Sequence, residues 1–71
     1  MNGFDRYENR RRVGLMIARL REAKGMTQQE LADAAEIDRA NLSKIENGRY
    51  NVSIDILGKI LFALDARINI I

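Results

Sequence analysis

Two short helical patterns adjoin in the middle of the sequence, and only two residues separate them. The first covers residues 27–35 and the second covers residues 38–47. The second pattern has only two large apolar residues, Leu42 and Ile45, before Gly48 ends it. A helix with so few apolar residues cannot be covered by a core on every side. The chain must therefore turn sharply between the two helices, and one face of the second must point outward.

Capping residues mark where these two helices begin. Thr27 and Glu30 form a T-x-x-E capping box, in which each side chain accepts a hydrogen bond from the backbone N–H of the other residue. Asp38 is the N-cap candidate of the second helix. The first helix then turns small or apolar side chains inward: Leu31, Ala32 and Ala35. Small alanines let another helix approach closely.

Longer apolar patterns flank this pair. Residues 8–24 have a helical period, and Gly25 follows as their stop. The apolar stripe of this helix is formed by Val13, Ile17 and Leu20 and is widened by Leu15 and Met16. Ser53 caps a fourth helix over residues 54–64. Its predicted core positions are Ile54, Leu57, Ile60, Leu61 and Leu64, whereas Ile56 and Phe62 lie on other faces.

The last residues change period. Ile68 and Ile70 alternate with Arg67 and Asn69, which is a strand pattern. We therefore predict an all-α fold of four helices plus a short C-terminal strand over residues 66–71, within a single domain spanning residues 1–71. A lone strand leaves its backbone groups unpaired, so pairing with a second copy is expected. The predicted homodimer interface contains Ile56, Phe62, Ile68 and Ile70; the alternative is a frayed tail.

Length and composition limit the chemistry. A chain of 71 residues supports one small core. It has no cysteine and no histidine, so the usual residues of zinc sites, haem ligation, thiol nucleophiles and Ser-His-Asp triads are missing. We expect no cofactor, no metal site and no enzymatic activity. Its apolar runs are far shorter than the ~20 residues of a membrane span, and its N-terminus lacks a signal peptide's apolar core. A cytoplasmic protein is expected.

The second short helix carries the pattern most relevant to function. At about 100° per residue, the face opposite Leu42 and Ile45 is polar and net positive. It consists of Arg39, Ala40, Ser43, Lys44 and Asn47. Such a helix fits the major groove of DNA, where base edges offer acceptors to Arg and Lys and paired groups to Asn. From the residues alone, a solvated face of an ordinary bundle remains the alternative.

The segment from Met26 to Ile54 resembles the helix-turn-helix of the Cro/C1-type (XRE) family of bacterial and phage regulators. The matching pieces are KGMTQQELA at residues 24–32, IDRANLSKIENG at residues 37–48 and the SIDIL that starts at Ser53. The resemblance implies a lambda-repressor-like bundle and a sequence-specific transcriptional regulator. It further implies a repressor that binds a palindromic site in double-stranded DNA as a homodimer.

The resemblance also implies roles for single residues. Positions that face base edges in the family are occupied here by Arg39, Ala40 and Lys44. Contacts to the DNA backbone are expected from Thr27, Gln28, Asn41, Ser43, Asn47, Arg49 and Tyr50. Arg21 and Glu46 match a family ion pair that joins the first and third helices. Glu36 stands where the family commonly has glycine, so either Glu36 adopts a left-handed conformation or the turn differs.

Two questions stay open at the level of sequence. Small helix-turn-helix proteins with a C-terminal strand also resemble antitoxins, in which one chain binds a toxin and represses its own operon. A toxin protein is therefore an alternative partner. The run Arg10, Arg11 and Arg12 is interpreted as a solvated helix start, with an N-terminal arm on DNA or a docking site for an acidic partner as alternatives.

Overall fold

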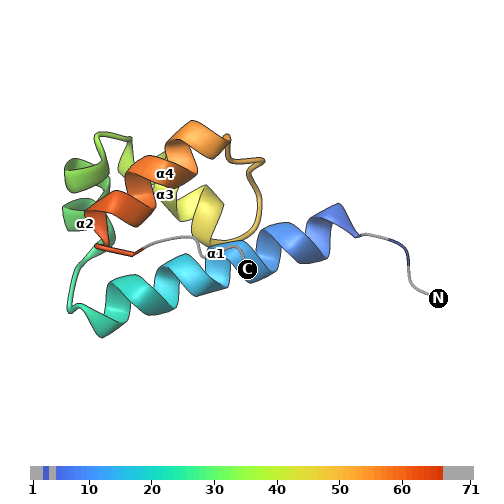
Figure 1. Ribbon diagram of the computed structural model, residues 1–71, viewed down its shortest axis with the longest axis horizontal. Helices are drawn as coiled ribbons and strands as arrows, with labels where there is room; N and C mark the ends of the chain where they lie inside the picture. The colour runs from blue at the N-terminus through green and yellow to red at the C-terminus, as the bar shows by residue number, and fades with distance from the viewer. Residues whose placement is uncertain (1–2, 4, 67–71) are drawn as a thin grey trace.

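The computed structural model describes residue 3 and residues 5–66, which form a four-helix bundle (Figure 1). The helices are α1 (Arg6–Ala23), α2 (Gln28–Ala35), α3 (Arg39–Glu46) and α4 (Ile54–Ala63). All four predicted helices are present, and the all-α, helix-turn-helix fold class is confirmed. The predicted strand lies, apart from residue 66, outside the described residues. None of the four described helices is both long and apolar enough to cross a membrane.

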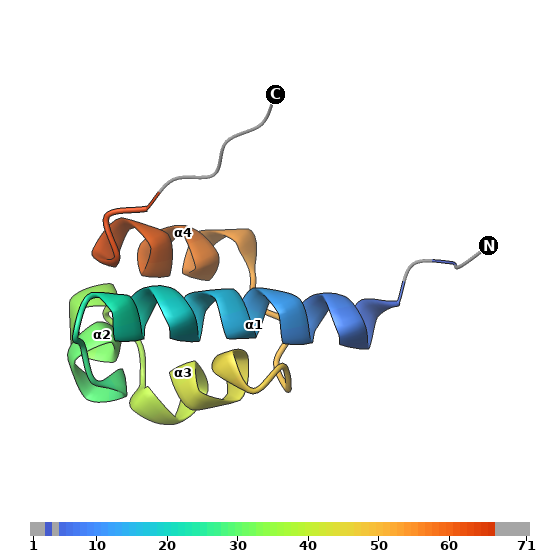
Figure 2. The ribbon, with the colours of Figure 1, turned by 90° about the horizontal axis from the view of Figure 1, so that it is seen from below.

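The long helix α1 runs along one side of the bundle (Figure 1), and seen from that side it lies between α4 and α3 (Figure 2). The short helix α2 packs against both α3 and α4, while α1 packs against α3. These contacts enclose one hydrophobic core, built from Ile17, Leu31, Ala32, Ala35, Leu42, Ile45, Ile60 and Leu64. Every helix contributes to this core, so the position of α3 is fixed by the rest of the bundle.

The predicted caps are formed with one exception. Thr27 Oγ1 accepts a bond of 3.0 Å from the Glu30 N–H, and Glu30 Oε1 accepts one of 2.8 Å from the Thr27 N–H, which completes the capping box. Ser53 Oγ accepts a hydrogen bond of 3.1 Å from the N–H of Ile56. Asp38 occupies the N-cap of α3, but its side chain makes no capping hydrogen bond. The first turn of α3 is closed by a backbone bond of 3.0 Å from the Leu42 N–H to the Asp38 carbonyl, without a side-chain cap.

The turn between α2 and α3 rests on a left-handed residue. Glu36 has φ 58° and ψ 44°, so it adopts the left-handed conformation, which was one of the two possibilities predicted for this position. The N–H of Ile37 then reaches back to the carbonyl of Ala32 at 2.9 Å and closes the end of α2. A left-handed non-glycine residue costs about 1–2 kcal/mol. The sharp turn therefore comes at a cost in stability.

Two assignments on α4 and two on α1 were wrong. Ile54, predicted for the core, is 73% exposed, whereas Ile56, predicted to face away, packs against the core. Ile54 is the first residue of α4 and shares its side of the helix with Phe62, which is 87% exposed as expected. On α1, Leu15 and Met16 are exposed, so the buried stripe is narrower than predicted. Helical period alone does not show where a neighbouring element stops covering the helix.

Candidate nucleic-acid interface

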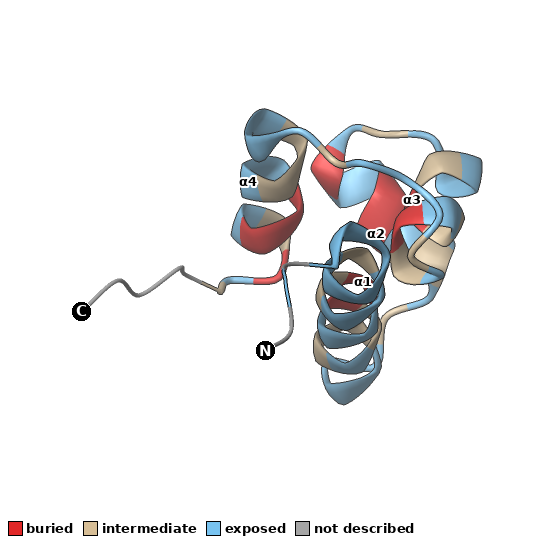
Figure 3. Ribbon diagram, turned by 90° about the vertical axis from the view of Figure 1, so that its right-hand side faces the viewer, coloured by how far each residue is buried: buried red, intermediate tan, exposed pale blue. Residues whose placement is uncertain are grey.

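Helix α3 has one buried and one open face, as the sequence predicts. Leu42 and Ile45 are buried in the core, whereas Arg39, Ala40 and Lys44 are exposed. The ribbon of α3 accordingly has both buried and exposed stretches (Figure 3). Of the other contact residues predicted on this helix, Asn41 and Ser43 are half-buried, and Asn47 at its end is exposed. The exposed face thus combines two cationic side chains, a methyl group and an amide. These are the groups that distinguish base edges in the major groove.

A bidentate ion pair holds the far end of α3 in place. Arg21 Nε donates to Glu46 Oε2 at 2.8 Å, and Arg21 Nη2 donates to Glu46 Oε1 at 3.0 Å. The third donor of the fork, Nη1, reaches the carbonyl of Met26 at 2.8 Å. Gln28 Nε2 adds a bond of 3.0 Å to Glu46 Oε1. One carboxylate therefore ties α1 and α2 to α3.

Burial makes this network more than a surface contact. The side chain of Glu46 is 5% exposed and that of Arg21 is 12% exposed. The hydrogen bond with Glu46 raises the pKa of Arg21, and this outweighs the opposite effect of burial. Arg21 is therefore charged at neutral pH, and the stability that its raised pKa contributes is lost as the pH rises through that pKa. The phosphate contact predicted for Gln28 would need its second amide hydrogen, because the first is used in this network.

The segment after α3 presents further donors at the surface. Asn47 caps α3, and its Nδ2 donates to the carbonyl of Ser43 at 2.9 Å. Gly48 has φ 73°, a conformation suited to glycine, and turns the chain away from the helix. Arg49 and Tyr50 follow and are exposed. Thr27 is exposed at the start of α2. The structure thus leaves the predicted backbone-contacting residues at the surface or half-buried.

Two glycines bring α1 against the end of α3: Gly14, which the sequence reasoning did not single out, and Gly48, which it interpreted as the stop of the helix. A Cβ built on Gly14 would collide with the Ile45 carbonyl oxygen and lie 2.7 Å from that of Glu46. A Cβ on Gly48 would lie 2.7 Å from Cγ of Arg11. A glycine inside an apolar helical pattern is the signal that could have revealed Gly14, because such a residue often marks close packing.

Comparison with known proteins agrees with this geometry. The helix-turn-helix family model matches residues 17–70. The ImmF control region 10 kDa protein of Bacillus phage phi105 is 34% identical over 61 residues, which are 86% of this chain and 68% of that protein. The immunity repressor protein of the same phage is 36% identical over 59 residues, which are 83% of this chain but only 41% of the repressor.

Solved structures show the same likeness. The restriction-modification controller protein C.AhdI from Aeromonas hydrophila has a TM-score of 0.84 and 34% identity, over 86% of this chain and 92% of that chain. The controller protein C.Esp1396I, solved as a tetramer with its natural 35 base-pair operator, has a TM-score of 0.78 and 34% identity, over 82% of this chain and 76% of that one. The chain belongs to the XRE-type helix-turn-helix family of DNA-binding transcriptional regulators.

Proposed function

We propose that this protein is a repressor that binds a palindromic operator as a homodimer. The observation that carries the proposal is the division of α3, whose buried side is Leu42 and Ile45 and whose open side presents Arg39, Ala40 and Lys44. Arg39 and Lys44 donate to guanine O6 and N7, and Ala40 contacts a thymine methyl group. The residues 27–28, 41, 43, 47, 49 and 50 contact phosphates and fix the register of the helix.

The names of the relatives support this proposal. One phage relative is an immunity repressor, and one structural relative holds its operator as a tetramer. A regulator with one recognition helix per chain gains a longer site by pairing, because two helices about 34 Å apart meet successive turns of the major groove. A twofold protein dimer then selects a palindromic sequence.

The outer face of α4 supports a second copy as the partner. Phe62 and Ile54 are the two most exposed large apolar residues of the described chain, and they lie on one face with Gly58 between them. A Cβ built on Gly58 meets no atom within 4 Å, so a second helix has room to approach there. If two α4 helices cross antiparallel at Gly58, Asp55 of each lies beside Lys59 of the other. Residues Ile68 and Ile70 extend this interface in the proposal.

The experiment that tests the proposal is selection from a random pool of DNA duplexes by the purified protein at near-physiological salt. Sequencing of the bound fraction should reveal an enriched palindrome, whose half-site spacing reports the separation of the recognition helices. Enrichment of a single half-site would contradict the homodimer. No enrichment would contradict sequence-specific binding by this chain alone and would favour the antitoxin hypothesis, in which a second protein is needed.

A further inference from the structure

We propose that Arg11 contacts a phosphate of the DNA backbone beside the end of the recognition helix, next to the phosphate contacted by Asn47. This inference rests on the proposed DNA binding. The consecutive residues Arg10, Arg11 and Arg12 have different surroundings: Arg10 lies over the ring of Tyr7, whereas Arg11 and Arg12 line a pocket beside α3.

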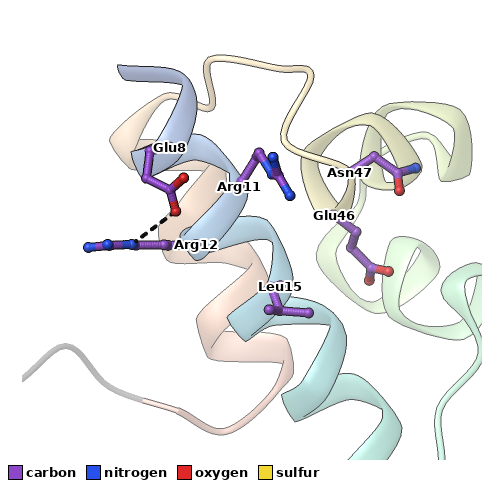
Figure 4. A pocket seen from close by; sticks show the side chains of 6 residues that line it. All are labelled: Glu8, Arg11, Arg12, Leu15, Glu46 and Asn47. Atoms are coloured by element: carbon purple, nitrogen blue, oxygen red, sulfur yellow. Dashed lines mark hydrogen bonds and ion pairs between the residues drawn. The ribbon is translucent and has the colours of Figure 1, made fainter. Parts of the chain in front are cut away.

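The site is an open pocket of about 290 Å³ between the first turns of α1 and the end of α3. Its lining residues are Glu8, Arg11, Arg12, Leu15, Glu46 and Asn47. Arg11 points from α1 into the space between the two helices, whereas Arg12 turns toward Glu8 (Figure 4). Of the three consecutive arginines, Arg11 is thus the one directed toward the DNA-facing end of α3.

Glycine at position 48 is what places Arg11 there. A Cβ on Gly48 would lie 2.7 Å from Cγ and 2.9 Å from Cα of Arg11, so any larger residue would push α1 away. The stem of Arg11 therefore lies directly against the loop that follows Asn47. A stem packed in this way loses less freedom when its guanidinium binds a ligand, because part of its motion is already restricted.

The charges around the pocket leave Arg11 as the available cation. Arg12 Nε pairs with Glu8 Oε2 at 3.2 Å, and Arg21 pairs with Glu46. Arg11 takes part in no ion pair within the described part of the chain. A phosphodiester carries one negative charge and accepts two parallel bonds from a guanidinium. The charge and the shape of Arg11 therefore match one backbone phosphate.

Asn47 contacts the adjacent phosphate and links the pocket to the recognition face. One hydrogen of its Nδ2 is donated to the carbonyl of Ser43, which leaves the other for a phosphate oxygen. Asn47 lies on the same side of the helix as Arg39 and Lys44, one turn beyond Lys44. Figure 4 shows the Asn47 amide directed away from Arg11, so the two side chains contact adjacent phosphates of one DNA strand rather than a single phosphate.

The ligand is a phosphate of DNA rather than a free anion. A single cation in a pocket open to solvent is screened by salt and binds a free ion weakly. A backbone phosphate is already held near the pocket when α3 enters the groove, so little additional ordering is needed. The contact adds affinity without reading sequence.

The test is the salt dependence of binding to the duplex enriched by selection, measured from 50 to 200 mM salt. In Arg11→Gln, each protomer of the dimer loses one phosphate contact, so the slope of log K against log salt should decrease in magnitude by about 1.8. The affinity ratio of wild type to variant should consequently shrink about 12-fold across this range. The preferred sequence should not change. Arg11→Lys retains the charge and should keep most of the slope.

Arg19→Gln is the matched control, because it removes the same charge from an exposed position of α1 beside Leu15 and Met16 instead. Thermal unfolding of each variant verifies that the bundle is intact. An unchanged slope in Arg11→Gln, or equal losses in Arg11→Gln and Arg19→Gln, overturns the inference while the proposed function stands. Failure of the wild-type protein to bind any duplex overturns both.

Discussion

Gly14 of α1 lies directly against the backbone carbonyl of Ile45 in the last turn of α3, with no room for a side chain between them. The atoms on the α3 side belong to backbone, which cannot swing aside as a flexible side chain would. This crossing, the contact of Gly48 with Arg11 and the Arg21–Glu46 pair together hold α1 against α3.

Gly14→Ala should therefore destabilise the fold, although alanine is the better helix former. Overpacking of this kind costs about 1–3 kcal/mol, and urea unfolding at low protein concentration measures it. Gly58→Ala is the matched control, since a Cβ there meets open space. It should instead raise the free energy of unfolding by about 0.5–1 kcal/mol. Stabilisation by both substitutions would show that the crossing is looser than described.

Arg21→Ala should destabilise the fold by about 3 kcal/mol, because it leaves the carboxylate of Glu46 almost fully buried with only Gln28 as a donor. Glu46→Ala should cost less, since Arg21 keeps its bond to the Met26 carbonyl and reaches solvent more easily. Arg21→Lys retains the charge but not the several donors of the guanidinium, so its free energy of unfolding should lie between those of wild type and Arg21→Ala. Thermal melts measure the stability of each variant, and selection from the random duplex pool measures its sequence preference. A changed sequence preference at unchanged stability would contradict the bracing role.

Arg39→Ala and Lys44→Ala should relax discrimination at single operator positions and leave the fold intact, because both side chains are exposed. Each lost base contact should reduce discrimination by about 1–3 kcal/mol. Competition between the selected duplex and singly substituted duplexes measures this. Arg19→Ala removes an exposed cation from α1, away from both α3 and the proposed α4 interface, and should leave discrimination unchanged. If the two α3 variants behave like Arg19→Ala, α3 is not the reading helix.

The sequence was most informative where structure is decided locally. The capping box at Thr27, the Ser53 cap and the glycine after α1 involve groups within a few residues of one another, so the four helices could be predicted. Burial depends on which elements meet in space, and helical period could not show that Ile54 lies beyond the core while Ile56 packs on it.

The candidate site likewise has some features that local sequence predicts and others that depend on tertiary packing. The polar face of α3 follows from helical geometry, whereas Arg21 and Glu46 stand 25 residues apart and were paired through family resemblance. Arg11 and Gly48 are farther apart still in sequence, and no local pattern relates them. Only the packing of α1 across α3 reveals that pocket.

Glu36→Gly should stabilise the protein by up to about 1 kcal/mol, because glycine removes the strain of the left-handed conformation but adds freedom to the unfolded chain. Chemical unfolding measures the difference. Asp65 is the comparison position, since its φ is also positive at 54°. Aspartate tolerates this region better than glutamate does, so Asp65→Gly should gain less. An equal or larger gain at Asp65 would contradict strain as the cause.

Phe62→Ser should weaken self-association without destabilising the monomer, because its side chain is 87% exposed and adds little to the core of one chain. Sedimentation velocity over a range of protein concentrations should show the dimer dissociating at higher concentration than in wild type. Met16→Ser removes a partly exposed apolar side chain from α1 and should leave the sedimentation coefficient unchanged. Truncation after residue 66 tests the contribution of Ile68 and Ile70 separately. If Phe62→Ser sediments as wild type while the truncated chain is monomeric, the second copy is held by the C-terminal residues and not by α4.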